Sequence, residues 1–207
     1  MAETLAQLVQ TPVTLFFLTL NVVVGAYTLL VDPSLISKWS FRPYLVRQRQ
    51  EMGRWITAGF VHVGLAHLAF NVITLFFFGP LIEYLIGPLR FFAVYMGSEL
   101  AANALTYWRH KDDPNYSAVG ASGAISGVLF AFVLFAPFEK IYIFFALPMP
   151  AIVFAFLYVA FSIYASKQGG GRVAHEAHLG GAIAGLVLTI LLYPASLGIF
   201  LQQLGLG

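Results

Sequence analysis

Long apolar segments occupy most of this chain and constrain its fold more than any other feature. A helix that crosses the hydrocarbon core of a bilayer needs about 20 mostly apolar residues, and six segments approach that length. Of the 207 residues, 59% are hydrophobic and only 10% are charged, whereas soluble domains carry about 25% charged residues. The pattern predicts an all-α, polytopic membrane protein with a single domain over residues 1–207. Its expected helices lie at about 13–31, 61–82, 91–108, 119–135, 141–165 and 178–201.

Charge and cysteine content argue against several other classes of protein. The formal net charge is +2, which is too small to indicate a nucleic-acid partner. The absence of cysteine excludes disulfides and thiolate metal sites, and the pattern indicates neither a metal nor an organic cofactor. The stretch from Met1 to Thr11 has no basic residue of the kind that starts a signal peptide. We therefore expect the first apolar segment to remain attached.

Polar side chains inside the apolar segments are the candidates for function, because polarity at membrane depth is costly without a partner or a role. His67 and Asn71 are four residues apart and therefore share one face of the second segment. Glu99 lies within the third segment, with Asn103 one turn later. A proton or ion relay and a buried structural group both fit Glu99, and we favour the structural interpretation.

Ser122 and His178 each accompany a stripe of small residues. The glycines at helical spacing are Gly120, Gly123 and Gly127 around the serine, and Gly181 and Gly185 after the histidine. Such stripes let two membrane helices approach closely. If the two stripes face each other, the imidazole reaches the hydroxyl, and a serine nucleophile needs such an adjacent base. Small-residue stripes also occur where helices simply pack, so that alternative stays open here.

The fourth segment is short for a membrane span. A helix from Gly120 to Phe135 is about 24 Å long, and the hydrocarbon core is about 30 Å thick. The end that carries Ser122 should therefore lie below the membrane surface. Non-helical backbone at that depth must line protein or water, and hydrolysis requires such a wet cavity.

The motifs, taken in order, resemble those of the rhomboid family of intramembrane serine proteases. His67–Asn71 is similar to the family's His-x-x-x-Asn, and Gly120–Gly123 is similar to its Gly-x-Ser-Gly. Ala177–Gly181 resembles the Ala-His-x-x-Gly pattern of the family's sixth helix. The resemblance extends from about Arg54 to Gly185. Each motif is weak alone, and the ordered set at these spacings is specific.

The resemblance implies a six-helix rhomboid-like bundle and an endopeptidase that cleaves transmembrane segments of other membrane proteins. Ser122 would be the nucleophile and His178 its base, in a dyad without a carboxylate. The side chains of His67 and Asn71 and the backbone N–H of Ser122 would hold the oxyanion. Glu83 matches a family position that ties down the loop before the next helix. The implied partners are transmembrane protein substrates and the lipid bilayer, and no cofactor is implied.

Two positions depart from the family pattern. Gly53–Arg54 stands where the family often has Trp-Arg, so either Trp55 supplies the aromatic side chain or the loop is anchored differently. Ser126 stands four residues after the serine, where the family often has an aromatic residue that stacks on the base. His178 would then be held less rigidly, or Ser126 would hydrogen-bond it. Both catalytic groups are present, so activity is expected.

Charge and resemblance disagree about orientation in the membrane. Nine Lys and Arg residues lie on the side that holds Ser122, and two lie on the other. The positive-inside rule would place the site in the cytoplasm. Many of the nine lie in Asp32–Gln50, whose mixture of basic and aromatic residues is typical of a segment in the headgroup region. We adopt the orientation of bacterial family members, with the site facing outward from the bacterial plasma membrane.

Two other functions remain to be weighed. A non-catalytic rhomboid-like protein that binds transmembrane helices would be expected to lack Ser122 or His178, and both are present. A small channel or transporter built around Glu99 would be expected to have a polar stripe through several helices. The polar residues of this chain gather toward one side instead.

Overall fold

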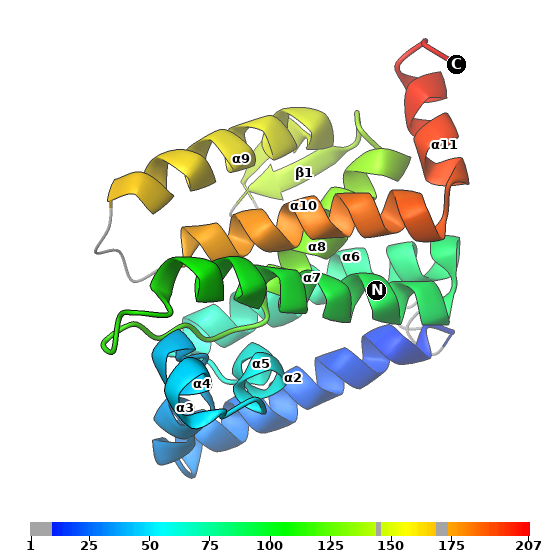
Figure 1. Cartoon of the computed structure of the whole chain (residues 1–207). Helices are drawn as coiled ribbons and strands as arrows, with labels where there is room; N and C mark the ends of the chain where they lie inside the picture. Colours follow the sequence, from blue (N-terminus) through cyan, green and yellow to red (C-terminus); the bar gives the residue numbers. More distant parts are fainter. Residues whose placement is uncertain (1–9, 144–145, 169–173) are drawn as a thin grey trace.

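The computed structural model of the chain describes residues 10–143, 146–168 and 174–207, which form a bundle of helices (Figure 1). The long helices are α2 (Pro12–Leu30), α6 (Leu65–Ile86), α7 (Pro88–His110), α8 (Ser122–Phe135), α9 (Ala151–Gln168) and α10 (His175–Leu192). Within the described residues, α2, α6 and α10 are long and apolar enough to cross a membrane. Helix α8 and the part of α9 up to Ser166 are also apolar but shorter. The predicted class, a helical polytopic membrane protein, is confirmed, and the count of six spans stays a prediction.

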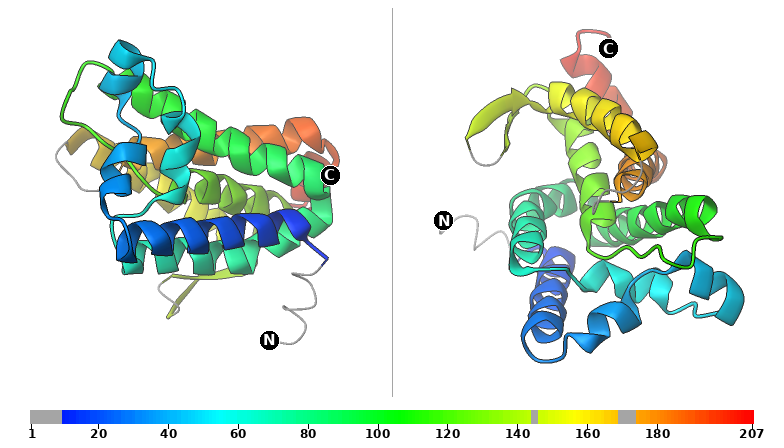
Figure 2. Two further views of the ribbon diagram at one scale, coloured as in Figure 1. Left: turned by 90° about the horizontal axis from the view of Figure 1, so that it is seen from below. Right: turned by 90° about the vertical axis from the view of Figure 1, so that its left-hand side faces the viewer.

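Shorter elements connect or extend the long helices. Between α2 and α6 lie α3 (Ser34–Trp39), α4 (Pro43–Arg49), α5 (Arg54–Thr57) and η1 (Ala58–Phe60). The strands β1 (Lys140–Ile143) and β2 (Leu147–Pro150) lie between α8 and α9, and α11 (Ala195–Gln203) follows α10. Figures 1 and 2 show α3, α4 and α5 at one end of the bundle and α11 at the other.

Helix α8 forms the centre of the bundle. Every residue from Gly123 to Phe135 is buried, and α8 packs against α6, α7 and α10. Helices α7 and α10 also pack against each other. A helix that is apolar on all sides suits such an enclosed position. Ser122, the first residue of α8, therefore lies at the N-terminal end of a buried helix.

The expected helix from residue 141 to residue 165 is wrong at its start. Instead, β1 and β2 pair as an antiparallel hairpin in which Lys140 is opposite Pro150, and α9 begins only at Ala151. The β-branched and aromatic side chains of Ile141–Ile143 favour a strand, and prolines at 148 and 150 disfavour a helix that runs through them. Residues 144–145 of the expected helix lie outside the described residues.

The expected helix from residue 178 to residue 201 is also divided. Helix α10 begins three residues earlier, at His175, and ends at Leu192. Pro194 precedes α11, which begins at Ala195. Proline removes a backbone donor and clashes with the preceding turn, so the helix stops and a separate one begins in a new direction.

Gly53 stands where the family often has Trp, and the two residues after it, Arg54 and Trp55, anchor the segment that precedes α6. Arg54 Nη1 donates a hydrogen bond to the carbonyl oxygen of Ser40 at 2.7 Å. The ring of Trp55 lies 5.1 Å from that of Phe41 and 5.8 Å from that of Tyr107, centroid to centroid. Trp55 therefore supplies an aromatic anchor that joins this segment to α7.

Glu83 is buried and reaches across to the start of α2. Its carboxylate accepts hydrogen bonds from the backbone N–H groups of Val13 at 3.0 Å and Thr14 at 2.6 Å. These amides have no carbonyl partner one turn earlier in α2, and the positive end of the helix dipole favours a nearby anion. The carboxylate thus caps α2, whereas the resemblance implied a role at the loop that follows α6.

Replacing Glu83 by alanine is expected to destabilise the protein by about 1–3 kcal/mol, because the buried N–H of Thr14 and the partly buried N–H of Val13 lose their acceptor. The measurement is thermal unfolding of the purified protein in detergent micelles. The exposed Glu139, replaced in the same way, is the control and should leave the melting temperature unchanged. Equal effects of the two substitutions would contradict the capping role.

Candidate active site

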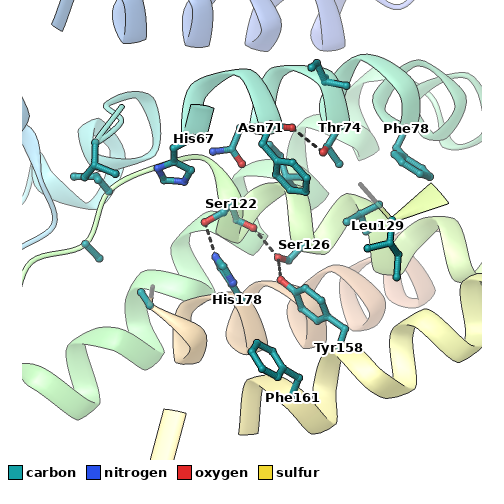
Figure 3. A pocket seen from close by; sticks show the side chains of 18 of the residues that line it. His67, Asn71, Thr74, Phe78, Ser122, Ser126, Leu129, Tyr158, Phe161 and His178 are labelled. Atoms are coloured by element: carbon teal, nitrogen blue, oxygen red, sulfur yellow. Dashed lines mark hydrogen bonds between the residues drawn. The ribbon is translucent and has the colours of Figure 1, made fainter. Parts of the chain in front are cut away.

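Ser122 and His178 meet in the interior of the bundle, at the first turns of α8 and α10. The distance between Oγ of Ser122 and Nε2 of His178 is 2.7 Å, which is hydrogen-bonding distance. Figure 3 shows Ser122 between His178 on one side and His67 and Asn71 on the other. The structure therefore brings together the four side chains that the sequence singled out, from α6, α8 and α10.

The two glycine stripes face each other and allow this approach. A Cβ atom added to Gly181 would lie 2.0 Å from the backbone oxygen of Gly123. One added to Gly185 would lie 2.2 Å from the Cα atom of Gly127. No side chain fits at such distances, so backbone contacts backbone along the crossing of α8 and α10. The hydroxyl–imidazole hydrogen bond depends on this close crossing.

Gly120 makes room for the polar side chains of α6. Its φ angle of +110° is one that L side chains rarely adopt. A Cβ atom there would lie 2.5 Å from Cε1 and 2.8 Å from Nε2 of His67, and 3.6 Å from Nδ2 of Asn71. Both nitrogens thus face the turn that leads into Ser122.

Asn71 and Ser122 present hydrogen-bond donors in this region. Asn71 is buried, and its Nδ2 has no hydrogen-bond partner among the described residues. A buried donor without a partner costs about 1–3 kcal/mol and calls for an explanation. Helix α8 begins at Ser122, so the N–H of that residue has no intrahelical acceptor one turn earlier. An oxygen atom placed next to the Ser122 hydroxyl would satisfy such donors.

Ser126 does not bond to His178. Its Oγ donates to the backbone oxygen of Ser122 at 2.7 Å and lies 2.5 Å from the hydroxyl oxygen of Tyr158. The Tyr158 ring lies 6.2 Å from the His178 ring, with the two planes 25° apart. An aromatic side chain of α9 therefore stands beside the imidazole. The sequence reasoning missed Tyr158, although a hydroxyl inside the apolar helix α9 was the available signal.

A second polar group fixes the start of α10. Glu176 is buried and accepts a hydrogen bond from the Tyr116 hydroxyl at 2.5 Å, and its carboxylate lies 3.1 Å from Nε2 of His110. Burial, and then the hydrogen bond to Glu176, raise the pKa of Tyr116, so its hydroxyl stays protonated and donates. These contacts join the α7–α8 connection to the turn that carries His178. The sequence analysis did not identify them.

Glu99 and Asn103 together make three hydrogen bonds that fit a structural role. One carboxylate oxygen accepts from Nδ2 of Asn103 at 3.2 Å, and the other accepts from the backbone N–H of Ala124 at 3.2 Å. Asn103 also donates to the backbone oxygen of Trp55 at 3.0 Å. The side chain therefore holds the first turn of α8 against α7, which favours the structural interpretation over a relay.

A cavity of about 1400 Å³ gives access to the site. Ser122, His178, His67 and Asn71 line it, together with mostly apolar side chains of α6, α9 and β1. In the part of the chain that the structure describes, His, Asp and Glu nowhere gather in a group of three suited to a metal ion. The site therefore joins a hydrogen-bonded hydroxyl and imidazole to a large, mainly apolar cavity.

The fold and this site define a helical membrane protein with a paired serine and histidine inside its bundle. Residues 49–195 match the profile of the Rhomboid domain, and the chain belongs to the rhomboid family. The matched range contains Ser122, His178, His67 and Asn71. The resemblance found from the motifs is confirmed.

Several known proteins are similar to this chain. The putative rhomboid protease YdcA of Bacillus subtilis is 45% identical over 85 residues, which cover 41% of each chain. Rhomboid protein 1, mitochondrial, of Saccharomyces cerevisiae is 31% identical over 160 residues, 72% of this chain and 45% of the relative. The rhomboid protease AarA of Providencia stuartii is 28% identical over 203 residues, 86% of this chain and 71% of the relative. The match spans less than half the length of the first two relatives.

Proposed function

We propose that the protein is an intramembrane serine endopeptidase that cleaves transmembrane segments of other membrane proteins. The observation that carries the proposal is the 2.7 Å contact between the Ser122 hydroxyl and the His178 imidazole, at a cavity inside the bundle. A hydroxyl becomes an effective nucleophile when an adjacent base accepts its proton. Membership in the rhomboid family supports the proposal, as does similarity to proteins named rhomboid proteases.

The proposed reaction has two halves, and His178 acts in both. Nε2 of the neutral imidazole accepts the Ser122 proton while Oγ attacks the carbonyl carbon of the scissile bond. The imidazolium then gives this proton to the leaving amine, and an acyl-enzyme ester on Ser122 remains. Water in the cavity attacks the ester with His178 again as the base, which releases the acid and restores the hydroxyl.

The donors around Gly120 would stabilise the oxyanion of the tetrahedral intermediate. We assign this role to the side chains of His67 and Asn71 and to the backbone N–H of Ser122. The unpartnered Nδ2 of Asn71 supports the assignment, because a preorganised donor can stabilise the developing charge without reorganisation during the reaction.

Replacing Asn71 by alanine is expected to lower kcat by about 10²–10³-fold, because one oxyanion donor is lost. The KM should change little, since the donor acts mainly in the transition state. Steady-state cleavage of a transmembrane reporter in proteoliposomes measures both constants. Thr74→Ala is the matched control: Thr74 lies on α6, lines the same cavity and donates only to the backbone oxygen of Phe70. A similar loss of kcat in both variants would contradict the assignment.

The proposed function is tested by comparing the wild type with Ser122→Ala on a single-pass transmembrane substrate in proteoliposomes. Cleavage by the wild type alone is expected. Equal cleavage by both proteins would overturn the assignment of the nucleophile. A wild type that captures the substrate without cleaving it would favour the alternative, a non-catalytic binder of transmembrane helices.

We also propose the bacterial plasma membrane as the location. The match to AarA of Providencia stuartii, a bacterium, extends over 86% of the chain and supports this location. Other relatives are mitochondrial, such as Rhomboid protein 1 of yeast. Both kinds of relative are consistent with an integral, multi-pass membrane protein.

A further inference from the structure

The His178 ring needs a second constraint besides its bond to Ser122. One hydrogen bond at Nε2 leaves the ring free to rotate about it, and serine hydrolases orient the base with a third group. In the described part of the chain, no hydrogen bond to Nδ1 of His178 is present, so ring contacts are the constraint that the described residues supply. The neighbouring rings are those of Tyr158 at 6.2 Å and His175 at 6.1 Å. Only the Tyr158 ring lies near parallel to the imidazole, at 25°.

Tyr158 is itself held to the nucleophile by a chain of hydrogen bonds. The Ser126 proton is donated to the backbone oxygen of Ser122 at 2.7 Å. The Tyr158 hydroxyl must therefore be the donor in its 2.5 Å contact with Ser126 Oγ. The ring also packs against Phe130 of α8 at 5.7 Å. The Tyr158 hydroxyl is thus linked through Ser126 to the backbone of Ser122.

We propose that Tyr158 is the positioning residue for His178, with its ring orienting the imidazole and its hydroxyl anchored through Ser126 to the first turn of α8. This inference rests on the proposed protease function. Position 126 holds a small residue, and the ring beside the base comes from α9 instead. Serine and tyrosine together therefore replace the single aromatic side chain that the family often has on α8.

Because the Tyr158 ring belongs to α9, which lines the cavity, the orientation of His178 is coupled to substrate binding. Tyr158 lines the cavity together with Phe154 and Phe161 of the same helix. A substrate segment in the cavity therefore contacts the wall that orients the base. Displacement of α9 would break the Ser126 bond and the ring contact together, so orientation of His178 depends on how α9 is seated.

The test uses the full chain in proteoliposomes and two readouts. The first is the rate at which a small fluorophosphonate probe labels Ser122, which requires an activated hydroxyl and no transmembrane substrate. The second is kcat and KM for a transmembrane reporter. Phe156→Ala is the control, because Phe156 lies on α9 and is 80% exposed.

Tyr158→Ala is expected to slow labelling and lower kcat by about tenfold, the upper end of what an aromatic pair contributes. The KM should change less. Tyr158→Phe keeps the ring and should lose less than Tyr158→Ala. The double substitution Ser126→Tyr with Tyr158→Ala supplies a ring from α8 and should recover part of the labelling rate.

Three results would overturn the proposal. Wild-type labelling by Tyr158→Ala with a raised KM would make Tyr158 a wall residue only. Equal losses in Tyr158→Phe and Tyr158→Ala would exclude a role for the ring. Absence of labelling in the wild type, judged against Ser122→Ala, would overturn the protease function and the positioning role together, and is thereby distinguished from the first two results.

Discussion

Replacing His178 by alanine is expected to lower cleavage of a transmembrane substrate by up to about 10⁶-fold, the loss found when a serine protease loses its histidine base. Without an acceptor 2.7 Å from Oγ, the Ser122 proton has no place to go during attack. The leaving amine also loses its proton donor. The measurement is kcat/KM in proteoliposomes, together with thermal unfolding to show that the fold persists. Stability should change little, because His178 is not fully buried and its imidazole contributes one side-chain hydrogen bond.

His175 provides the matched control for this prediction. It lies one turn earlier on α10, with its ring 6.1 Å from that of His178, and His175→Ala should reduce activity far less. Ser122→Ala combined with His178→Ala should be no less active than either single variant, because two groups that act as a unit are not additive. Additive losses would show that the two side chains act separately and would contradict the dyad.

The positions of most helices could be predicted because lipid imposes a simple requirement on sequence. Helix α2 differs by one residue at each end from the segment expected at 13–31. The hairpin before α9 could not be predicted, because its apolar residues satisfy the same composition rule as a membrane helix. Only local propensity and the prolines at 148 and 150 distinguish the two, and these are weaker signals than a long apolar run.

Residue spacing predicted the close approach of Ser122 and His178, but it did not predict the contacts of Tyr158 and Glu176. Glycines at helical spacing indicated a close crossing of two helices, and the structure brings Ser122 and His178 together there. The contacts of Tyr158 and Glu176 join elements far apart in sequence, because Tyr158 follows Ser126 by 32 positions and Glu176 follows Tyr116 by 60. No periodicity within one helix encodes such a pair, so side-chain partners of this kind appear only once the helices are packed.

Replacing Gly181 by alanine is expected to damage stability and activity together. The added Cβ would meet the backbone oxygen of Gly123 at 2.0 Å and its carbonyl carbon at 2.7 Å. Backbone atoms in the middle of a bundle cannot move aside as a flexible side chain can, so α8 and α10 must separate. Overpacking of this kind costs about 1–3 kcal/mol or more. Separation of the helices also lengthens the Ser122–His178 contact, so labelling of Ser122 by a fluorophosphonate should fall by at least about tenfold, since a small misplacement of catalytic groups costs up to 10²-fold.

Gly198→Ala separates this effect from the general consequence of changing a glycine. A Cβ at Gly198 of α11 would meet no atom within 4 Å, and alanine favours the helix over glycine by up to about 1 kcal/mol. This variant should melt at or above the wild-type temperature and label normally. His178→Ala should lose activity and keep stability, whereas Gly181→Ala should lose both. A Gly181→Ala protein with wild-type stability and labelling would mean that α8 and α10 do not touch along their glycines, and the close crossing that places the imidazole beside the hydroxyl would have to be abandoned.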